Sequence, residues 1–249
     1  MNLIKEDETL EDLQLKGIKV IQKQNGFRFG VDAVLLANYA KVKKGGSVID
    51  LCSGTGIIPF IITGKKEVSK IVGVEIQEDM VDMAKRSAMY NSLEDKIRFV
   101  NGSITDKSLL KRIDKADVVT VNPPYKLRNS GLINYNDKDA IARHEICCTL
   151  EDVIIATRKL LKDNGRMYMV HRPERLADIF CLMRKHKIEP KVIRMVHPSI
   201  NKAPNIVLIE GQRDGKAFLK WEDPLYIHEK DGSYTEEINK IYGKEVTIK

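Results

Sequence analysis

The sequence has few cysteines, no long apolar run and no basic, then apolar, leader at its start. No apolar stretch approaches the ~20 residues that span a bilayer, and the opening residues, "MNLIKEDETLEDL", are acidic. These absences predict a cytoplasmic protein without membrane contact. The four cysteines, Cys52, Cys147, Cys148 and Cys181, show neither C-x-x-C spacing nor a His pair at zinc distance. We therefore expect no metal site, and we predict reduced, mostly buried thiols.

Repeats, low-complexity tracts and Pro/Gly/Ser linkers are also absent from the 249 residues. The hydrophobic share of 43% and the charged share of 31% are typical of a globular protein with one sizeable core. We expect a single domain over residues 1–249, in which 47–216 form the core sheet. Residues 1–46 would then precede the core as a segment covering the cofactor, and 217–249 would form a C-terminal appendage.

The net charge of +7 is concentrated in one part of the chain. Residues 126–216 contain 18 Lys and Arg against 11 Asp and Glu, an excess equal to that of the whole chain. This asymmetry favours a polyanionic partner approaching this region. Lys and Arg on solvated helix faces remain the alternative explanation.

Short β-branched runs alternate with longer helical patterns along most of the chain. We predict strands at 47–51, 70–75, 97–102, 117–122, 166–170, 191–196 and 205–211, and a helix within 78–91. This alternation is typical of an α/β protein with a mainly parallel sheet of about seven strands, covered on both faces. Only "HPSINKAP" separates the last two strands, so we expect an antiparallel hairpin at the C-terminal end of the sheet.

Both ends of the chain add further elements to this sheet. "FRFGVDAVLLANYA" predicts a loop and then a helix, with Asp32 able to cap the first turn. Near the C-terminus, an Asp231-Gly232 turn precedes a helix expected to start near Thr235.

A glycine loop and an acidic residue follow the first two predicted core strands. "DLCSGTG" places Gly54 and Gly56 directly after the first strand, where a backbone without Cβ atoms can approach a ligand. The loop matches neither the phosphate-loop nor the G-x-G-x-x-G pattern. Glu75 closes the second strand, where a carboxylate can accept both hydroxyl protons of a ribose. Together they indicate a nucleoside cofactor, although a structural turn and an acid that starts a helix are the alternatives.

Asn122-Pro123-Pro124-Tyr125 ends the fourth predicted strand, at the same sheet edge. The two prolines fix the backbone without adding N–H donors, so main-chain oxygens and the Asn122 amide oxygen form acceptors for a planar NH₂ group. Tyr125 adds a flat surface for stacking. Such acceptors favour a pyramidal nitrogen whose lone pair can attack an electrophile. The alternative is a turn stiffened by prolines.

These residues carry a family resemblance that extends over nearly the whole chain. "FRFGVDAVLLANYA", "DLCSGTG", "VGVEIQ", "VNPPY", "IARHE" and "NIVLIEG" occur in an order that resembles the Rossmann-like methyltransferases that use S-adenosylmethionine. Within that class, the combination is similar to the bacterial tRNA1(Val) (adenine-37-N6)-methyltransferase family. The resemblance implies methylation of the exocyclic N6 amino group of an unpaired adenine in tRNA.

The resemblance also implies roles for individual residues. Asp50, Gly54 and Gly56 would hold the methionine part of S-adenosylmethionine, and Glu75 its ribose. The further expected cofactor contacts are Phe29, Asp32, Ser53, Thr55, Ile76, Ser103, Ile104 and Asn122. Ser103 stands where related enzymes often carry an Asp beside the adenine, and Cys52 stands where many relatives have Gly. The amino group and its base would contact the catalytic residues Asn122, Pro123, Pro124 and Tyr125.

The expected RNA contacts are Tyr125, Lys126, Arg128, Arg143, His144 and Lys202. The polar segment 126–142 is equally compatible with a lid over the RNA and with an ordinary loop. His144 can be a proton acceptor or a structural hydrogen-bonding residue, and Lys202 can contact phosphate or simply be solvated.

Three other functions are compatible with the same residues. Protein glutamine N5-methylation uses the same grip on an amide, but such enzymes usually carry a helical domain ahead of the core, and only 46 residues precede the first core strand here. Guanine N2-methylation of ribosomal RNA is the second alternative. A non-catalytic RNA-binding module that retains a cofactor pocket is the third.

Overall fold

Five parallel strands form the centre of the sheet. The computed structural model describes residues 3–25, 30–124 and 148–243. The central strands stand in the order β5-β4-β3-β6-β7, with β3 in the middle. Their bounds are β3 (Ser47–Leu51), β4 (Lys70–Glu75), β5 (Ile97–Asn101), β6 (Ala116–Val121) and β7 (Leu161–His171). Their apolar, β-branched sequences suit a sheet that is covered on both faces.

The C-terminal strands add an antiparallel part to this sheet. β9 (Ile206–Arg213) pairs antiparallel with β7 on one side and with β8 (Ile188–Ser199) on the other. The predicted mainly parallel sheet with an antiparallel hairpin is therefore confirmed. Two short strands were not predicted, β10 (Lys220–Trp221) and β11 (Leu225–His228), and both pair parallel with β8. The sheet thus continues past residue 216, where we expected the core to end.

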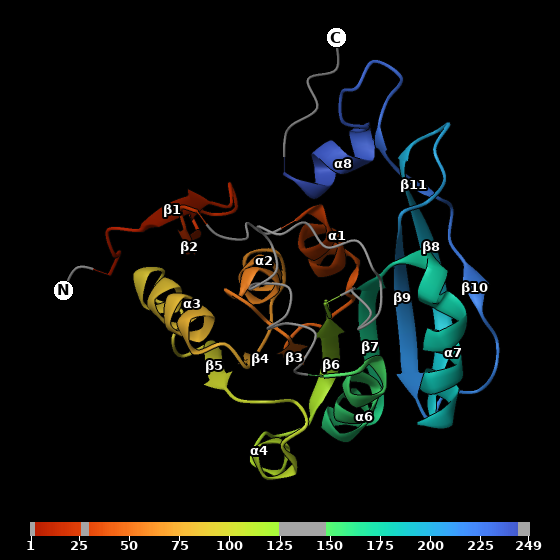
Figure 1. Cartoon of the computed structure of the whole chain (residues 1–249), viewed down its shortest axis with the longest axis horizontal. Helices are drawn as coiled ribbons and strands as arrows, with labels where there is room; N and C mark the ends of the chain where they lie inside the picture. Colours follow the sequence, from red (N-terminus) through yellow and green to blue (C-terminus); the bar gives the residue numbers. More distant parts are fainter. Residues whose placement is uncertain (1–2, 26–29, 125–147, 244–249) are drawn as a thin grey trace, which may run out of the picture.

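Helices cover both faces of the sheet, and each face has its own core (Figure 1). One core contains residues of α1 (Val31–Tyr39), α2 (Ile57–Lys65), α3 (Glu78–Tyr90) and α8 (Glu236–Ile241). The other contains residues of α4 (Lys107–Lys111), α6 (Leu150–Leu160) and α7 (Leu176–Lys185), which follows the short 3-10 helix η1 (Pro173–Arg175). No helix among the described residues is long and apolar enough to cross a membrane.

The predicted helix starts agree with the structure at one end of the chain and differ at the other. Thr235 caps α8, because its hydroxyl accepts a hydrogen bond from the amide of Ile238. At α1, however, the N-cap is Gly30, and Asp32 lies inside the first turn. The prediction of Asp32 as the cap was therefore wrong. A carboxylate in the first turn still interacts favourably with the positive end of the helix dipole.

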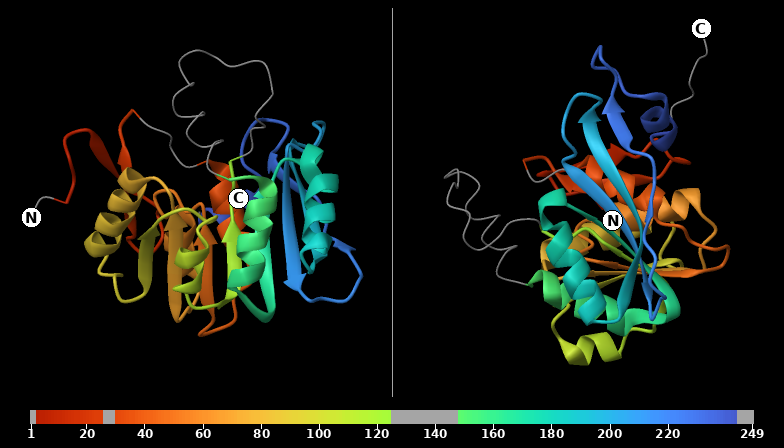
Figure 2. Two further views of the ribbon diagram at one scale, coloured as in Figure 1. Left: turned by 60° about the horizontal axis from the view of Figure 1, so that its bottom comes forward. Right: turned by 90° about the vertical axis from the view of Figure 1, so that its right-hand side faces the viewer.

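An N-terminal hairpin packs on α3, and the sequence did not predict it. It consists of β1 (Glu8–Asp12) and β2 (Lys19–Lys23), which pair only with each other within the described residues. Figure 2 shows the hairpin at one end of the molecule, beside α3. Side chains of α3 and its C-cap bind the backbone of β2. The Ser87 hydroxyl accepts a hydrogen bond from the Ile21 amide at 2.8 Å, and the side-chain oxygen of the C-cap, Asn91, accepts one from the Lys19 amide at 2.9 Å.

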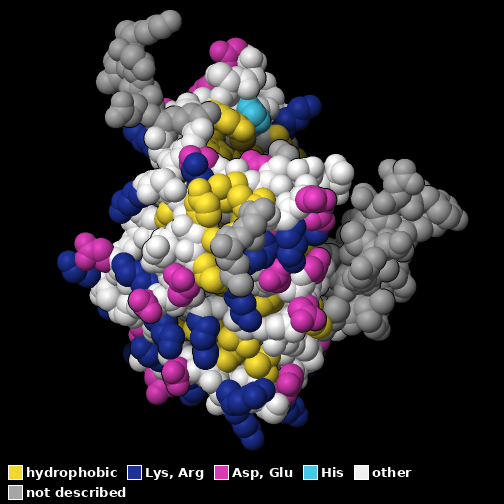
Figure 3. All heavy atoms as spheres, turned by 90° about the vertical axis from the view of Figure 1, so that its left-hand side faces the viewer, with side chains coloured by type: hydrophobic (Ala, Val, Ile, Leu, Met, Phe, Trp, Pro, Cys, Tyr) yellow, Lys and Arg dark blue, Asp and Glu magenta, His cyan; other side chains and the backbone are white. Residues whose placement is uncertain are grey.

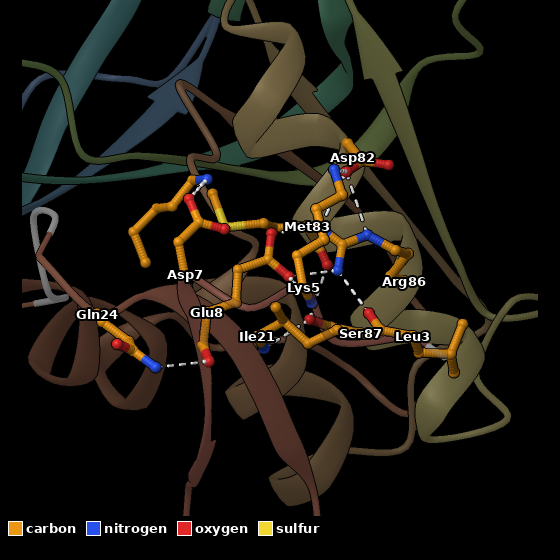
Figure 4. Close-up of polar contacts among 11 residues, drawn as sticks. Leu3, Lys5, Asp7, Glu8, Ile21, Gln24, Asp82, Met83, Arg86 and Ser87 are labelled. Atoms are coloured by element: carbon orange, nitrogen blue, oxygen red, sulfur yellow. Dashed lines mark hydrogen bonds and ion pairs between the residues drawn. The ribbon is translucent and has the colours of Figure 1, made fainter. Parts of the chain in front are cut away.

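A buried ion pair fixes the hairpin to α3 (Figure 4). The Arg86 guanidinium donates to both carboxylate oxygens of Glu8, at 2.6 and 2.7 Å, and also to Asp82 on its own helix. The Glu8 side chain is 1% exposed, and the hydrogen bonds from Arg86 lower its pKa below the usual range. Such bidentate pairs are geometrically specific, so this contact sets where the hairpin lies on α3.

Replacing Glu8 with Ala should lower the free energy of unfolding by about 3 kcal/mol, because it breaks a buried pair and leaves Arg86 with less compensation. Lys5→Ala is the matched control, since Lys5 forms an exposed pair with Asp82 at 2.7 Å and such pairs contribute about 0–1 kcal/mol. Urea unfolding measures both variants. Equal, small losses would show that the Glu8–Arg86 pair does not anchor the hairpin.

Candidate functional site

The predicted site residues come together at the carboxyl edge of the parallel strands. β3 pairs with both β4 and β6, so that Leu51 lies opposite Val74 on one side and Val121 on the other. The glycine loop that follows β3 is therefore flanked by Glu75 at the end of β4 and by Asn122 just after β6. This is the edge at which open α/β sheets bind their ligands.

The loop after β3 turns sharply because two glycines adopt left-handed conformations. Gly54 has φ of 54° and Gly56, the N-cap of α2, has φ of 84°. A Cβ atom at Gly56 would lie 2.4 Å from Cζ of Phe99, whereas a Cβ at Gly54 would meet no atom within 4 Å. Gly56 is therefore required by packing. Gly54 instead leaves open space beside the loop, which is the arrangement expected where a ligand approaches the backbone.

Glu75 ties this loop to the end of β4. Its Oε2 accepts a hydrogen bond from the Gly54 amide at 2.9 Å, and its Oε1 accepts from the amides of Ile76 and Gln77, both at 3.0 Å. The residue is 5% exposed. Each carboxylate oxygen can accept two hydrogen bonds, so Oε2 retains capacity for a ligand hydroxyl. The structure thus gives Glu75 a role in shaping the loop, beside the ribose contact that the sequence suggested.

Asp50 lies fully buried beneath the same loop. Its Oδ1 accepts a hydrogen bond from the hydroxyl of Thr120 at 2.6 Å, whereas its Oδ2 has no partner among the described residues. Burial raises the pKa of Asp50 to about 7, and the nearby hydroxyls of Thr120 and Ser53 oppose this increase. The buried Ser53 hydroxyl thus lies close enough to the Asp50 carboxyl to act on its pKa. Thr120, in β6, was not predicted as a site residue.

Gln22 is a second site residue that the sequence did not predict. It belongs to β2 and is 1% exposed, and its Nε2 lies 3.4 Å from the Thr55 hydroxyl of the glycine loop. Its Oε1 is buried without a hydrogen-bond partner in the described part of the chain. Only the position of the hairpin brings Gln22 to the loop, and no sequence pattern predicted that position.

The expected adenine side of the site lies at the ends of β4 and β5. Ile76 exposes 38% of its surface directly after Glu75, while Ile104 is buried. The Ser103 hydroxyl contacts the Thr105 hydroxyl at 2.8 Å. The nearest following carboxylate, that of Asp106, caps α4 by accepting from the amides of Ser108 and Leu109. It therefore already has a structural role and does not replace the missing acid at position 103.

Asn122 directly follows β6, and the chain continues into Pro123, which is buried, and Pro124, which is half-buried. Tyr125 and the expected contacts Phe29, Lys126, Arg128, Arg143 and His144 lie outside the described residues. Lys202 is exposed in the connection between β8 and β9. Because β8 runs in the same direction as β7, this connection lies at the same sheet edge as the glycine loop.

Many basic side chains of residues 126–216 form ion pairs, but most of these pairs involve acidic residues that the excess of the segment already counts. Most basic side chains described in this segment pair with acidic neighbours: Arg158, Lys162, Arg166, Arg175, Arg184, Lys185, Arg194 and Arg213. Figure 3 shows the side of the molecule at which α3 and the N-terminal hairpin lie. On that side, basic and acidic side chains are interspersed. The ion pairs therefore leave the net excess of the segment largely unchanged, and they restrict the basic side chains free to contact a polyanion to others, such as Lys202.

The described cysteines are free thiols, as expected, but the prediction that they are mostly buried was wrong. Cys52 and Cys148 are half-buried, and Cys181 is exposed on α7. Contact with Cys148 and burial raise the pKa of the Cys52 thiol, so that it stays protonated beside the glycine loop. No group of three potential metal ligands occurs within residues 3–25, 30–124 and 148–243.

Comparison with known proteins agrees with this geometry. A mainly parallel sheet with a glycine loop after the first core strand, an acidic residue at the end of the second and an antiparallel C-terminal pair of strands is compatible with an α/β methyltransferase fold. Residues 42–219 match the family described as "Methyltransferase domain", and the chain belongs to this family.

Individual relatives and solved structures give a consistent result. The chain is 27% identical to a tRNA1(Val) (adenine(37)-N6)-methyltransferase of Porphyromonas gingivalis, over 91% of each chain. It is 24% identical to the enzyme of that name from Aeromonas hydrophila, over 84% of this chain and 86% of the relative. A predicted O-methyltransferase from Agrobacterium tumefaciens shares the fold, with a TM-score of 0.69 and 20% identity over 85% of this chain and 95% of that one.

A more distant structure shares the fold and contains a cofactor product. It is the geranyl diphosphate C-methyltransferase of Streptomyces coelicolor, in complex with S-adenosyl-L-homocysteine. Its TM-score is 0.56, with 14% identity over 74% of this chain and 77% of that one.

Substitution of the two loop glycines should show that packing requires Gly56 but not Gly54. Gly54→Ala should lower the free energy of unfolding by about 1 kcal/mol, the cost of a left-handed conformation. Gly56→Ala should cost about 3 kcal/mol or more, because its Cβ also collides with Phe99. Urea unfolding of both variants is the measurement. Similar losses for the two would mean that the Phe99 ring moves aside easily.

Asp50 should make the stability of the cofactor-free protein depend on pH. Its pKa of about 7 in the folded chain lies above that of an unfolded Asp, so the folded protein binds this proton more tightly. Stability from this group is therefore present at pH 5 and is lost as pH rises through about 7. The free energy of unfolding of Asp50→Asn, measured with urea, should therefore rise relative to that of the wild type as the pH increases from 5 to 8. Asp106→Asn, whose pKa is lowered, is the control and should show no such change; parallel curves for Asp50→Asn and wild type would contradict the assignment.

Proposed function

We propose that this methyltransferase transfers a methyl group from S-adenosylmethionine to N6 of an unpaired adenine in tRNA, the adenine at position 37 of the anticodon loop. The observation that carries the proposal is the position of Asn122-Pro123-Pro124 directly after β6, beside the glycine loop. The relatives named as tRNA1(Val) (adenine(37)-N6)-methyltransferases support the substrate.

The residues present fit S-adenosylmethionine. Gly54 leaves open space at the loop, and two buried acceptors at or beside it lack donors among the described residues: Gln22 Oε1 and Asp50 Oδ2. Asp50 and the loop would hold the methionine part, Glu75 the ribose, and Ile76 the adenine face. When bound, the group supplies an electrophilic methyl on a sulfonium.

The proposed reaction depends on acceptors at the end of β6. An amino group conjugated to a ring is a poor nucleophile, because its lone pair is delocalised. The Asn122 side-chain oxygen and a neighbouring main-chain oxygen would accept hydrogen bonds from the two N–H groups of the amine. These hydrogen bonds would stabilise the nitrogen as it becomes tetrahedral. The prolines make this grip rigid before the substrate arrives. No general base is needed until the methylated amine loses a proton.

The tRNA would be bound by residues that follow β6 and by the connection between β8 and β9, at the same edge of the sheet. Lys202, between β8 and β9, would contact phosphate, and Tyr125 would stack on the base. An anticodon-loop adenine is already unpaired, so little energy is needed to extrude it. The whole chain would act as one domain, since residues from 1–46, such as Gln22, and from 217–249, such as Leu225 and Ile238, pack against the core.

One experiment distinguishes this function from its alternatives. The protein is incubated with labelled S-adenosylmethionine and, separately, with total tRNA, ribosomal RNA and peptide release factors, and the products are digested to single residues. Label in N6-methyladenosine from tRNA supports the proposal. Label in N2-methylguanosine or in methylglutamine identifies one of the other enzymes, and tRNA binding without label identifies a binding module.

The role of Asn122 can be tested in the same assay. If Asn122 acts mainly in the transition state, Asn122→Ala should lose most of the methylation rate, roughly a hundredfold, as for the removal of one oxyanion-hole donor. Its affinity for tRNA should change little. Single-turnover kinetics and equilibrium binding measure both quantities. A variant that methylates at close to the normal rate would remove Asn122 from the mechanism.

A further inference from the structure

The hairpin brings one side chain to the glycine loop from outside the sheet. Arg86 and Ser87 of α3 fix β1 and β2 in place, and α3 itself begins just after Glu75. The same element that follows the end of β4 therefore positions Gln22. The Gln22 amide group reaches Thr55, with Nε2 3.4 Å from the hydroxyl.

The hydrogen-bonding capacity of this corner is unbalanced. Gln22 Oε1 and Asp50 Oδ2 act as acceptors, and neither has a donor among the described residues, although both residues are at most 1% exposed. A buried polar atom without a partner is unfavourable, so two such acceptors beside one loop indicate that a ligand supplies the donors. An ammonium group fits, because it has three donors and no acceptor.

We propose that Gln22 binds the cofactor: its Oε1 accepts a hydrogen bond from the amino group of the methionine part, next to Asp50, while its Nε2 holds Thr55. The inference rests on the proposed use of S-adenosylmethionine. It gives the N-terminal hairpin a direct part in the site, and it explains why a buried ion pair holds the hairpin on α3. The positive amino group would also favour the ionised form of Asp50.

The test compares two ligands that differ in the amino-acid part. S-Adenosylhomocysteine carries the amino group, whereas 5′-methylthioadenosine has the same nucleoside and a thioether without it. Calorimetry should show that Gln22→Ala binds S-adenosylhomocysteine about tenfold or more weakly and binds 5′-methylthioadenosine within twofold of the wild type. Gln22→Met, which keeps the side-chain volume, should show the same selective loss and replaces the Ala variant if that one does not fold.

Gln24→Ala is the matched control on the same hairpin. Its side chain is exposed and its Nε2 donates to the carbonyls of Glu6 and Glu8, so both ligands should bind as in the wild type. Equal losses for the two ligands, or no loss for either, in the Gln22 variants would overturn the inference. If the wild type itself bound neither ligand, the proposed cofactor would be wrong, which is a distinct outcome from a failure of Gln22.

Discussion

The site depends on one carboxylate that accepts three backbone hydrogen bonds. Glu75 joins the end of β4 to Gly54 through one oxygen and organises its own turn through the other. Without a negative charge there, the loop amide and the two amides of the turn would all need other acceptors. The glycine loop is thus shaped by the residue that is also proposed to bind ribose, so its conformation and its ligand affinity depend on the same group.

The sheet and most of the site were predictable because their determinants are local. The strands of the core are apolar runs, and Gly54, Gly56, Glu75 and Asn122 each follow such a run directly, so the topology brings them to one edge. Two left-handed glycines also leave a recognisable pattern in the sequence. These features do not require knowledge of contacts between distant segments.

The remaining parts depend on long-range contacts that a sequence does not display. β1 is largely polar, and its position comes from the contact of Glu8 with a residue 78 positions away. In the sequence, Gln22 therefore cannot be told from an ordinary polar residue of a short strand. β10 has only two residues and gives no periodicity. The basic excess was visible in the sequence, but the ion pairs that decide which basic side chains remain available were not.

The antiparallel insertion of β9 between β7 and β8 has a consequence for how such a protein can change. Because β8 runs in the same direction as β7, the β8–β9 connection lies at the edge that holds the glycine loop. The edge is thereby divided between β3, β4 and β5 on one side and β6, β7 and β8 on the other. Loops of the second half can vary in length and charge while those of the first stay constant. New substrates could therefore evolve in this fold without rebuilding the part that we propose binds the methyl donor.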